Sequence, residues 1–101
     1  MYLYNTTFVV ESSEIDWWQK WMRDQYLPLF ASQVPSAAYE IFKIDGNGQQ
    51  GESTFSCQWR CEQIGDLGMI GKCADTLQNS LMKLKNGAIC CFSTMMKSIE
   101  I

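Results

Sequence analysis

Residues 53–62 read STFSCQWRCE, and this stretch decides the fold because it carries the clearest pattern in the chain. Apolar residues occupy every second position: Phe55, Cys57, Trp59 and Cys61. Polar residues fill the positions between them: Thr54, Ser56, Gln58, Arg60 and Glu62. A period of two is typical of a β-strand. The stretch therefore predicts a strand with one face in the core and one polar face.

The segments before this strand predict its nearest neighbours. Residues 38–45 alternate in a way that suits a strand with both faces partly covered. Gly46-Asn47-Gly48 then predicts a turn, and the following Gln-Gln-Gly makes it a long polar hairpin loop. The two strands are therefore expected to pair as an antiparallel hairpin.

The segment after this strand predicts a long amphipathic helix over residues 64–85. Its apolar residues recur at alternating steps of three and four: Leu67, Ile70, Ala74, Leu77, Leu81 and Leu84. Asn86-Gly87 supplies a C-terminal cap. Three glycines predict that its first half frays or lies close against a neighbour: Gly65, Gly68 and Gly71.

The outer parts of the chain complete the pattern. Tyr2–Glu11 is rich in Tyr, Thr, Phe and Val and predicts a first strand. A helix is expected from about Glu14, and because Pro28 lacks a backbone donor we expect it to kink or break near Leu27. Residues 88–97 predict a last strand.

The predicted order is β-α-β-β-α-β, which is the ferredoxin-like order of the α+β class. We expect one domain over residues 1–101, with a four-stranded antiparallel sheet and both helices on one of its faces. The other face is left open. An uncovered sheet face with Tyr, Trp and Met at its rim predicts a homodimer that pairs through this face.

Composition excludes several classes of function. The net charge is −3 and the eight Lys and Arg are scattered, which argues against nucleic acid as a partner. No stretch reaches the ~18 apolar residues of a membrane helix, so we expect a soluble, cytoplasmic protein without a membrane partner. The five cysteines lack disulfide or zinc spacing and are expected to be reduced, buried and free of metal. No cofactor is expected.

The candidate site is the polar face of the two central strands. It combines residues of the first and third strands: Asn5, Thr7, Ser56, Gln58 and Arg60. A buried Arg60 needs an acceptor, which a carboxylate of the partner chain or an anionic small molecule could supply. A polar network at a dimer interface is the leading interpretation, and a small-molecule site is the alternative.

Three segments carry a resemblance to a known family: Tyr4–Phe8, Lys20–Pro28 and Gln58–Glu62. With them the chain resembles an uncharacterised bacterial domain-of-unknown-function family of about this length. The resemblance implies a ferredoxin-like fold within the dimeric α+β barrel group, and it brings no assigned activity.

Some proteins that resemble this architecture are cofactor-independent enzymes with monooxygenase or isomerase chemistry. In such an enzyme Asn5, Trp21 and Arg60 would meet at a cavity on the open sheet face and act on a planar substrate. The absence of histidine removes Ser-His and Cys-His nucleophilic pairs, so a binding or structural module without enzymatic activity is the leading hypothesis.

Overall fold

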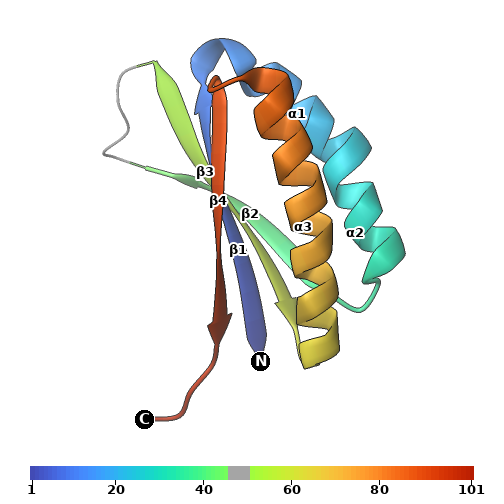
Figure 1. The fold of residues 1–101 in the computed structure, drawn as a ribbon. Helices are drawn as coiled ribbons and strands as arrows, with labels where there is room; N and C mark the ends of the chain where they lie inside the picture. Colours follow the sequence, from blue (N-terminus) through green and yellow to red (C-terminus); the bar gives the residue numbers. More distant parts are fainter. Residues whose placement is uncertain (46–50) are drawn as a thin grey trace.

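The computed structural model describes residues 1–45 and 51–101. Its elements follow in the order β1 (Tyr2–Glu11), η1 (Ser12–Glu14), α1 (Ile15–Trp21), η2 (Met22–Tyr26), α2 (Leu27–Gln33), β2 (Ala38–Ile44), β3 (Glu52–Cys61), α3 (Ile64–Lys85) and β4 (Ile89–Lys97) (Figure 1). The predicted order of strands and helices is confirmed. The predicted hairpin turn at residues 46–50 lies outside the described residues.

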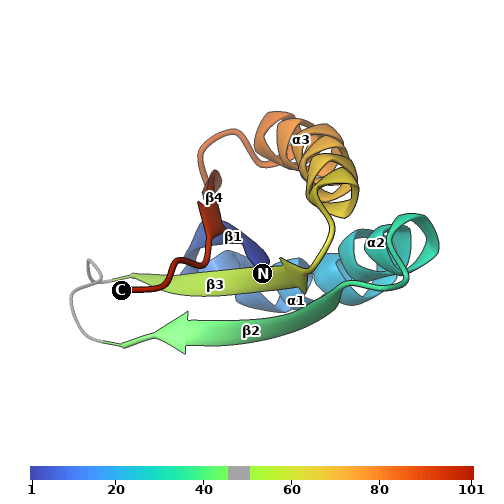
Figure 2. The same cartoon turned by 90° about the horizontal axis from the view of Figure 1, so that it is seen from below.

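The four strands form one antiparallel sheet in the order β2-β3-β1-β4. The helices pack on one face of this sheet, and the other face carries no element of the described chain (Figures 1 and 2). In the register of the central pair, Asn5 lies opposite Gln58 and Thr7 lies opposite Ser56. This pairing confirms that the polar positions of the two central strands are neighbours.

The helix is irregular at the predicted place, because one helical element ends at Tyr26 and the next begins at Leu27, but the chain stays helical past Pro28 and does not break. Residues Met22–Tyr26 form a π-helical turn, in which the Leu27 N–H donates to the Met22 carbonyl. The π-helical turn holds one residue more than an α-helical turn. Pro28 therefore lies in the first turn of α2, where the hydrogen bond that its missing N–H cannot form is a small loss of stability. The sequence marked the place of the irregularity but not its kind.

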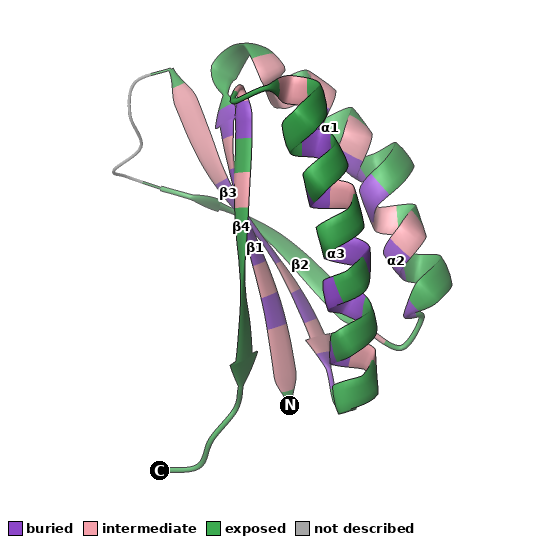
Figure 3. Cartoon of the chain, in the orientation of Figure 1, coloured by how far each residue is buried: buried purple, intermediate pink, exposed green. Residues whose placement is uncertain are grey.

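Strand β2 buries none of its seven residues and lies at the edge of the sheet, and Figure 3 shows it in the exposed colour. Tyr39 and Ile41 on its helix side are 45% and 38% exposed, so this face is partly covered as predicted, whereas no element of the described chain covers the other face. Alternation along a strand predicts which residues share a face, but not how far other elements cover that face.

Aromatic pairs join the helices to the covered face of the sheet. Trp18 stacks on Phe55 with ring centroids 4.4 Å apart, and Phe30 stacks on Trp59 at 4.5 Å. Trp18 and Trp59 are buried, as expected for core residues. Such stacked pairs add about 0.5–1.5 kcal/mol to the free energy gained from burying their surface.

The long helix α3 begins and ends at the predicted residues, and Asn86 caps it with a left-handed backbone (φ 44°). Gly71 lies close to β4, because a Cβ placed on it would stand 3.0 Å from the Met95 methyl group. Leu84, the last residue of the predicted apolar stripe, is exposed. In the described ranges no helix is both long and apolar enough to span a membrane.

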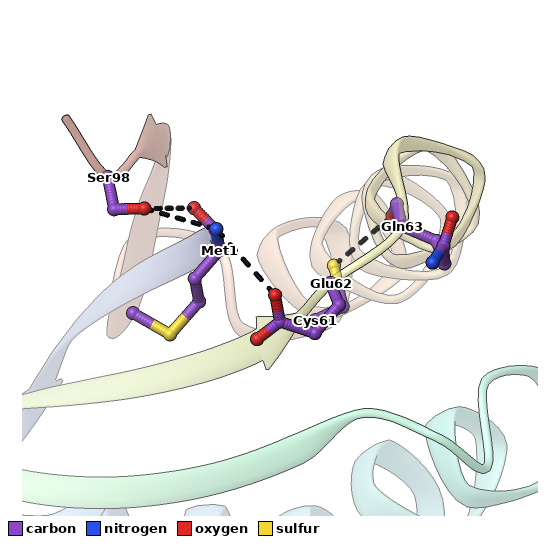
Figure 4. A network of polar contacts seen from close by, with 5 residues as sticks. All are labelled: Met1, Cys61, Glu62, Gln63 and Ser98. Atoms are coloured by element: carbon purple, nitrogen blue, oxygen red, sulfur yellow. Dashed lines mark hydrogen bonds and ion pairs between the residues drawn. The ribbon is translucent and has the colours of Figure 1, made fainter.

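The lower end of the sheet is tied together by a small set of polar contacts (Figure 4). The Met1 nitrogen donates to Ser98 Oγ at 3.1 Å and lies 3.7 Å from Glu62 Oε2. Nearby, Cys61 Sγ donates to the Gln63 carbonyl at 3.6 Å. The two Met1 contacts join the residues beside the ends of β1, β3 and β4, whereas the Cys61 contact is local to the connection between β3 and α3.

Candidate functional site

The open sheet face consists of the side chains that point away from the helices. In rows across β2, β3, β1 and β4 they are Ala38, Arg60, Leu3 and Met96; Glu40, Gln58, Asn5 and Thr94; Phe42, Ser56, Thr7 and Phe92; and Ile44, Thr54, Val9 and Cys90. The face therefore has a polar centre and a largely apolar rim.

Four of the predicted site residues form one hydrogen-bonded network at this centre. Ser56 Oγ donates to Asn5 Oδ1, and Asn5 Nδ2 donates to Thr7 Oγ1 at 3.2 Å. Gln58 Nε2 donates to Ser56 Oγ at a longer 3.4 Å. Thr7 and Ser56 are already buried within one chain. The network leaves these groups with intramolecular partners, which removes much of the free-energy cost of covering them.

Arg60 lies beside this network but is not buried as predicted. Its side chain is 35% exposed, and Nη2 lies 2.8 Å from Glu40 Oε1 of the same chain. Glu40 stands on the neighbouring strand opposite Gln58, one diagonal step from Arg60. The sequence predicts that Arg60 is buried and therefore that its acceptor lies in a partner chain or a ligand. The acceptor is instead Glu40 of the same chain, on the edge strand β2.

The rim of the face consists of large apolar side chains on the two edge strands. Their exposed fractions are 44% for Phe42, 49% for Ile44, 60% for Phe92 and 45% for Met96. The Tyr and Trp residues expected at this rim point instead to the helix side, as Tyr39 and Trp59 do. The rim carries methionine as predicted, with phenylalanine and isoleucine in place of the expected tyrosine and tryptophan.

Trp21 does not reach the open sheet face. It lies on α1 and packs against Phe8, with ring centroids 6.4 Å apart, on the helix side of the sheet. The hypothesised meeting of Asn5, Trp21 and Arg60 at one cavity is therefore wrong. Trp21 instead lines a cavity of about 560 Å³ between α1 and α3, together with Trp17 and Leu77.

Sequence reasoning missed a second polar cluster, which lies between α3 and the sheet and joins the buried Gln78 and Thr6 to the exposed Ser93. Gln78 Nε2 donates to Thr6 Oγ1 at 2.9 Å and to Ser93 Oγ at 3.0 Å, and the Thr6 and Ser93 hydroxyls lie 2.9 Å apart. The available signal was the spacing of Gln78, four residues after Ala74 and three before Leu81. A polar residue inside an apolar stripe predicts a buried polar partner on the facing element.

The cysteines are free thiols in different surroundings. Burial raises the pKa of Cys57 to about 12 and that of Cys91 to about 11. Cys90 is exposed and Cys91 is only half-buried, so the prediction that all five are buried is wrong for these two residues. Cys90 and Cys91 do point to opposite faces of β4, because they pair with Val9 and Phe8 respectively.

A raised pKa keeps a thiol protonated and unreactive near neutral pH. Within residues 1–45 and 51–101 no three His, Cys, Asp or Glu side chains are placed to hold a metal ion.

With this geometry in place, the chain can be compared with known proteins. A model of a domain of unknown function (DUF4286) matches residues 1–99. The chain belongs to the DUF4286 family. The predicted membership in a domain-of-unknown-function family is thus confirmed, and no activity comes with it. No curated protein matches the chain.

Solved structures similar to this DUF4286 chain have the ferredoxin-like fold. The de novo designed protein Foldit4 is 11% identical with a TM-score of 0.69, and the match covers 97% of this chain and 98% of that one. Protein Atu4242 from Agrobacterium tumefaciens is 15% identical with a TM-score of 0.63, covering 98% and 94%. A dimeric ferredoxin-like protein from an uncultured marine organism is 13% identical with a TM-score of 0.58, covering 100% and 99%. At these identities the likeness establishes the fold alone.

Proposed function

We propose that this chain works as a homodimer that pairs through the open sheet face, and that the dimer is a binding or structural module. The exposed apolar rim carries this proposal. Burying the exposed part of Phe42 and of Phe92 is worth about 1 kcal/mol for each side chain. A two-fold axis doubles every contact, so the same four apolar residues contribute from both copies.

The shape of the face suits this pairing. Strand spacing and rise give a flat area of roughly 19 by 23 Å per copy, which is smaller than the roughly 800 Å² per partner of a standard interface, so stable pairing requires the side chains of the two copies to interdigitate. In the central row, small Ser56 and Thr7 lie between bulky Phe42 and Phe92. A second copy can set its own phenylalanines against the small residues, so the rows can interdigitate. The dimeric ferredoxin-like protein of the marine organism supports the proposal as a precedent for dimers of this fold.

The polar centre fits an interface better than an enzyme site. Asn5, Ser56 and Thr7 satisfy one another within the chain, and Glu40 satisfies Arg60. Without Trp21 at this face, the cofactor-independent monooxygenase or isomerase alternative loses one of its three residues, and we do not propose it. We place the dimer in the cytoplasm, because the five free thiols suit a reducing compartment.

A matched pair of variants tests the dimer. Phe92→Glu places a charge on the rim of both copies, and we expect it to raise the dimer dissociation constant at least roughly 100-fold. Leu84→Glu is the control, since Leu84 is 66% exposed on α3, away from the open sheet face. Sedimentation equilibrium measures both. A monomeric wild-type protein, or equal dissociation constants for the two variants, would refute the proposal.

Binding of a small molecule on this face is the second candidate function. The effect of replacing Arg60 distinguishes it from a purely structural role of the face. Because Arg60 pairs with a half-exposed Glu40, Arg60→Ala should cost the monomer only about 0.2–1 kcal/mol. If Arg60 instead binds an anion, added phosphate raises the Tm of the wild type and not that of the variant. Native mass spectrometry of protein from its own host would detect a retained molecule.

A further inference from the structure

The outer edge of the sheet at β2 has the features of a binding surface. Beyond β2 the described chain places no further strand, so one row of its backbone N–H and C=O groups has no strand partner (Figure 2). Tyr39, Ile41 and Phe42 are also exposed, at 45%, 38% and 44%. A free edge with apolar side chains is a template for an added strand.

A groove runs along the helix side of this edge. One cavity of about 520 Å³ lies between α2 and the start of β2, and another of about 480 Å³ lies between η2 and its middle. Both are lined by Arg23 and Leu27, so they are neighbouring parts of one groove. Pro28 and Val34 make the first part apolar, and the Phe55 ring lines the second.

Among the residues that the structure describes, the charged ones that line this groove are all cations. Arg23 lines both parts and Lys43 lines the second, and no described Asp or Glu lines either. In the described part of the chain neither cation forms an ion pair, and residues 46–50 carry no acidic side chain that could supply one. This local charge is opposite in sign to the net charge of −3 of the whole chain.

We propose that the free edge of β2 binds an extended acidic segment of a partner protein. The segment adds a fifth strand through backbone hydrogen bonds, and acidic side chains on one of its faces lie against Arg23 and Lys43. Its apolar side chains contact the exposed side chains of β2. Main-chain pairing supplies affinity without regard to sequence, so the two cations select acidic segments over basic ones. The groove and its two cations lie on the helix side and stay accessible when the open sheet face is covered, whereas the apolar side chains of the added strand lie beside Phe42 at the rim of that face.

The probe is a fluorescein-labelled peptide that alternates glutamate and valine over the length of β2, with lysine in place of glutamate in the control peptide. Fluorescence anisotropy measures binding, and we expect the glutamate peptide to bind and the lysine peptide to bind at least roughly tenfold more weakly. The double variant Arg23→Glu/Lys43→Glu should lose roughly tenfold or more of the affinity for the glutamate peptide and gain affinity for the lysine peptide.

The control variant Lys72→Glu/Lys83→Glu makes the same change in net charge with exposed residues of α3, and its affinity should stay within about twofold. Amide chemical shifts in ¹⁵N-labelled protein locate the peptide, and Ala38–Ile44 should show the largest changes. Three results would overturn the proposal: equal loss of affinity in both double variants, shifts centred on the open sheet face, or edge-to-edge association of two copies that excludes the peptide.

Discussion

Replacing Gln78 tests whether the cluster under α3 is a satisfied polar network. Gln78→Met keeps the side-chain volume and removes the contacts at 2.9, 3.0 and 3.1 Å that join this residue to Thr6 and Ser93. A buried hydrogen bond contributes about 0.5–1.5 kcal/mol net, so we expect a loss of about 1–3 kcal/mol in the free energy of unfolding. The loss stays in this range because Thr6 and Ser93 keep their mutual bond. For a domain of this size the Tm should fall by roughly 5–15 °C.

The triple variant Thr6→Val/Gln78→Met/Ser93→Ala removes all three side chains that these hydrogen bonds join. Because an apolar replacement of a whole buried network is often neutral, we expect it to recover most of the stability that Gln78→Met loses. Urea unfolding followed by tryptophan fluorescence gives both free energies, with Thr76→Ala as an exposed control on the same helix. The reasoning fails if Gln78→Met is neutral, or if the triple variant is less stable than the single one.

Two further predictions concern α3 and the core. Gly68→Ala should stabilise the protein by about 0.5–1 kcal/mol, because no heavy atom lies within 4 Å of the new methyl group. Gly71→Ala should stabilise it less, because the Met95 side chain must move. Thermal melts should therefore give Gly68→Ala the higher Tm of the two variants. Cys57 should make stability fall as pH rises from about 9 towards 12. Its pKa of about 12 in the folded chain lies above the ordinary thiol value of 9.0, so only the unfolded chain releases the proton in that range. Urea midpoints of wild type and Cys57→Ala against pH measure this, and parallel curves for the two proteins would contradict it.

The sequence by itself determined the secondary structure and its order. Period-two alternation in residues 53–62 fixes which side chains of β3 face the core, and the register then brings Asn5 beside Gln58 and Thr7 beside Ser56. The stripe and the Asn86-Gly87 cap place α3 at the predicted residues. These features are local, because they depend on backbone preferences and on side chains that are close in the chain.

Only the tertiary structure decided what each surface meets. The predicted order already places β2 at the edge of the sheet, but only the packed structure shows that its seven residues stay exposed and that Glu40 reaches Arg60. The helical spacing of Trp21 does not determine which side of the sheet its ring lies on. Because α1 packs against Phe8, the Trp21 ring lies on the helix side of the sheet. Gln78 joins Thr6 and Ser93 across 72 and 15 positions in the chain. Contacts at such separations arise only when the elements are packed, and no pattern within a single segment encodes them.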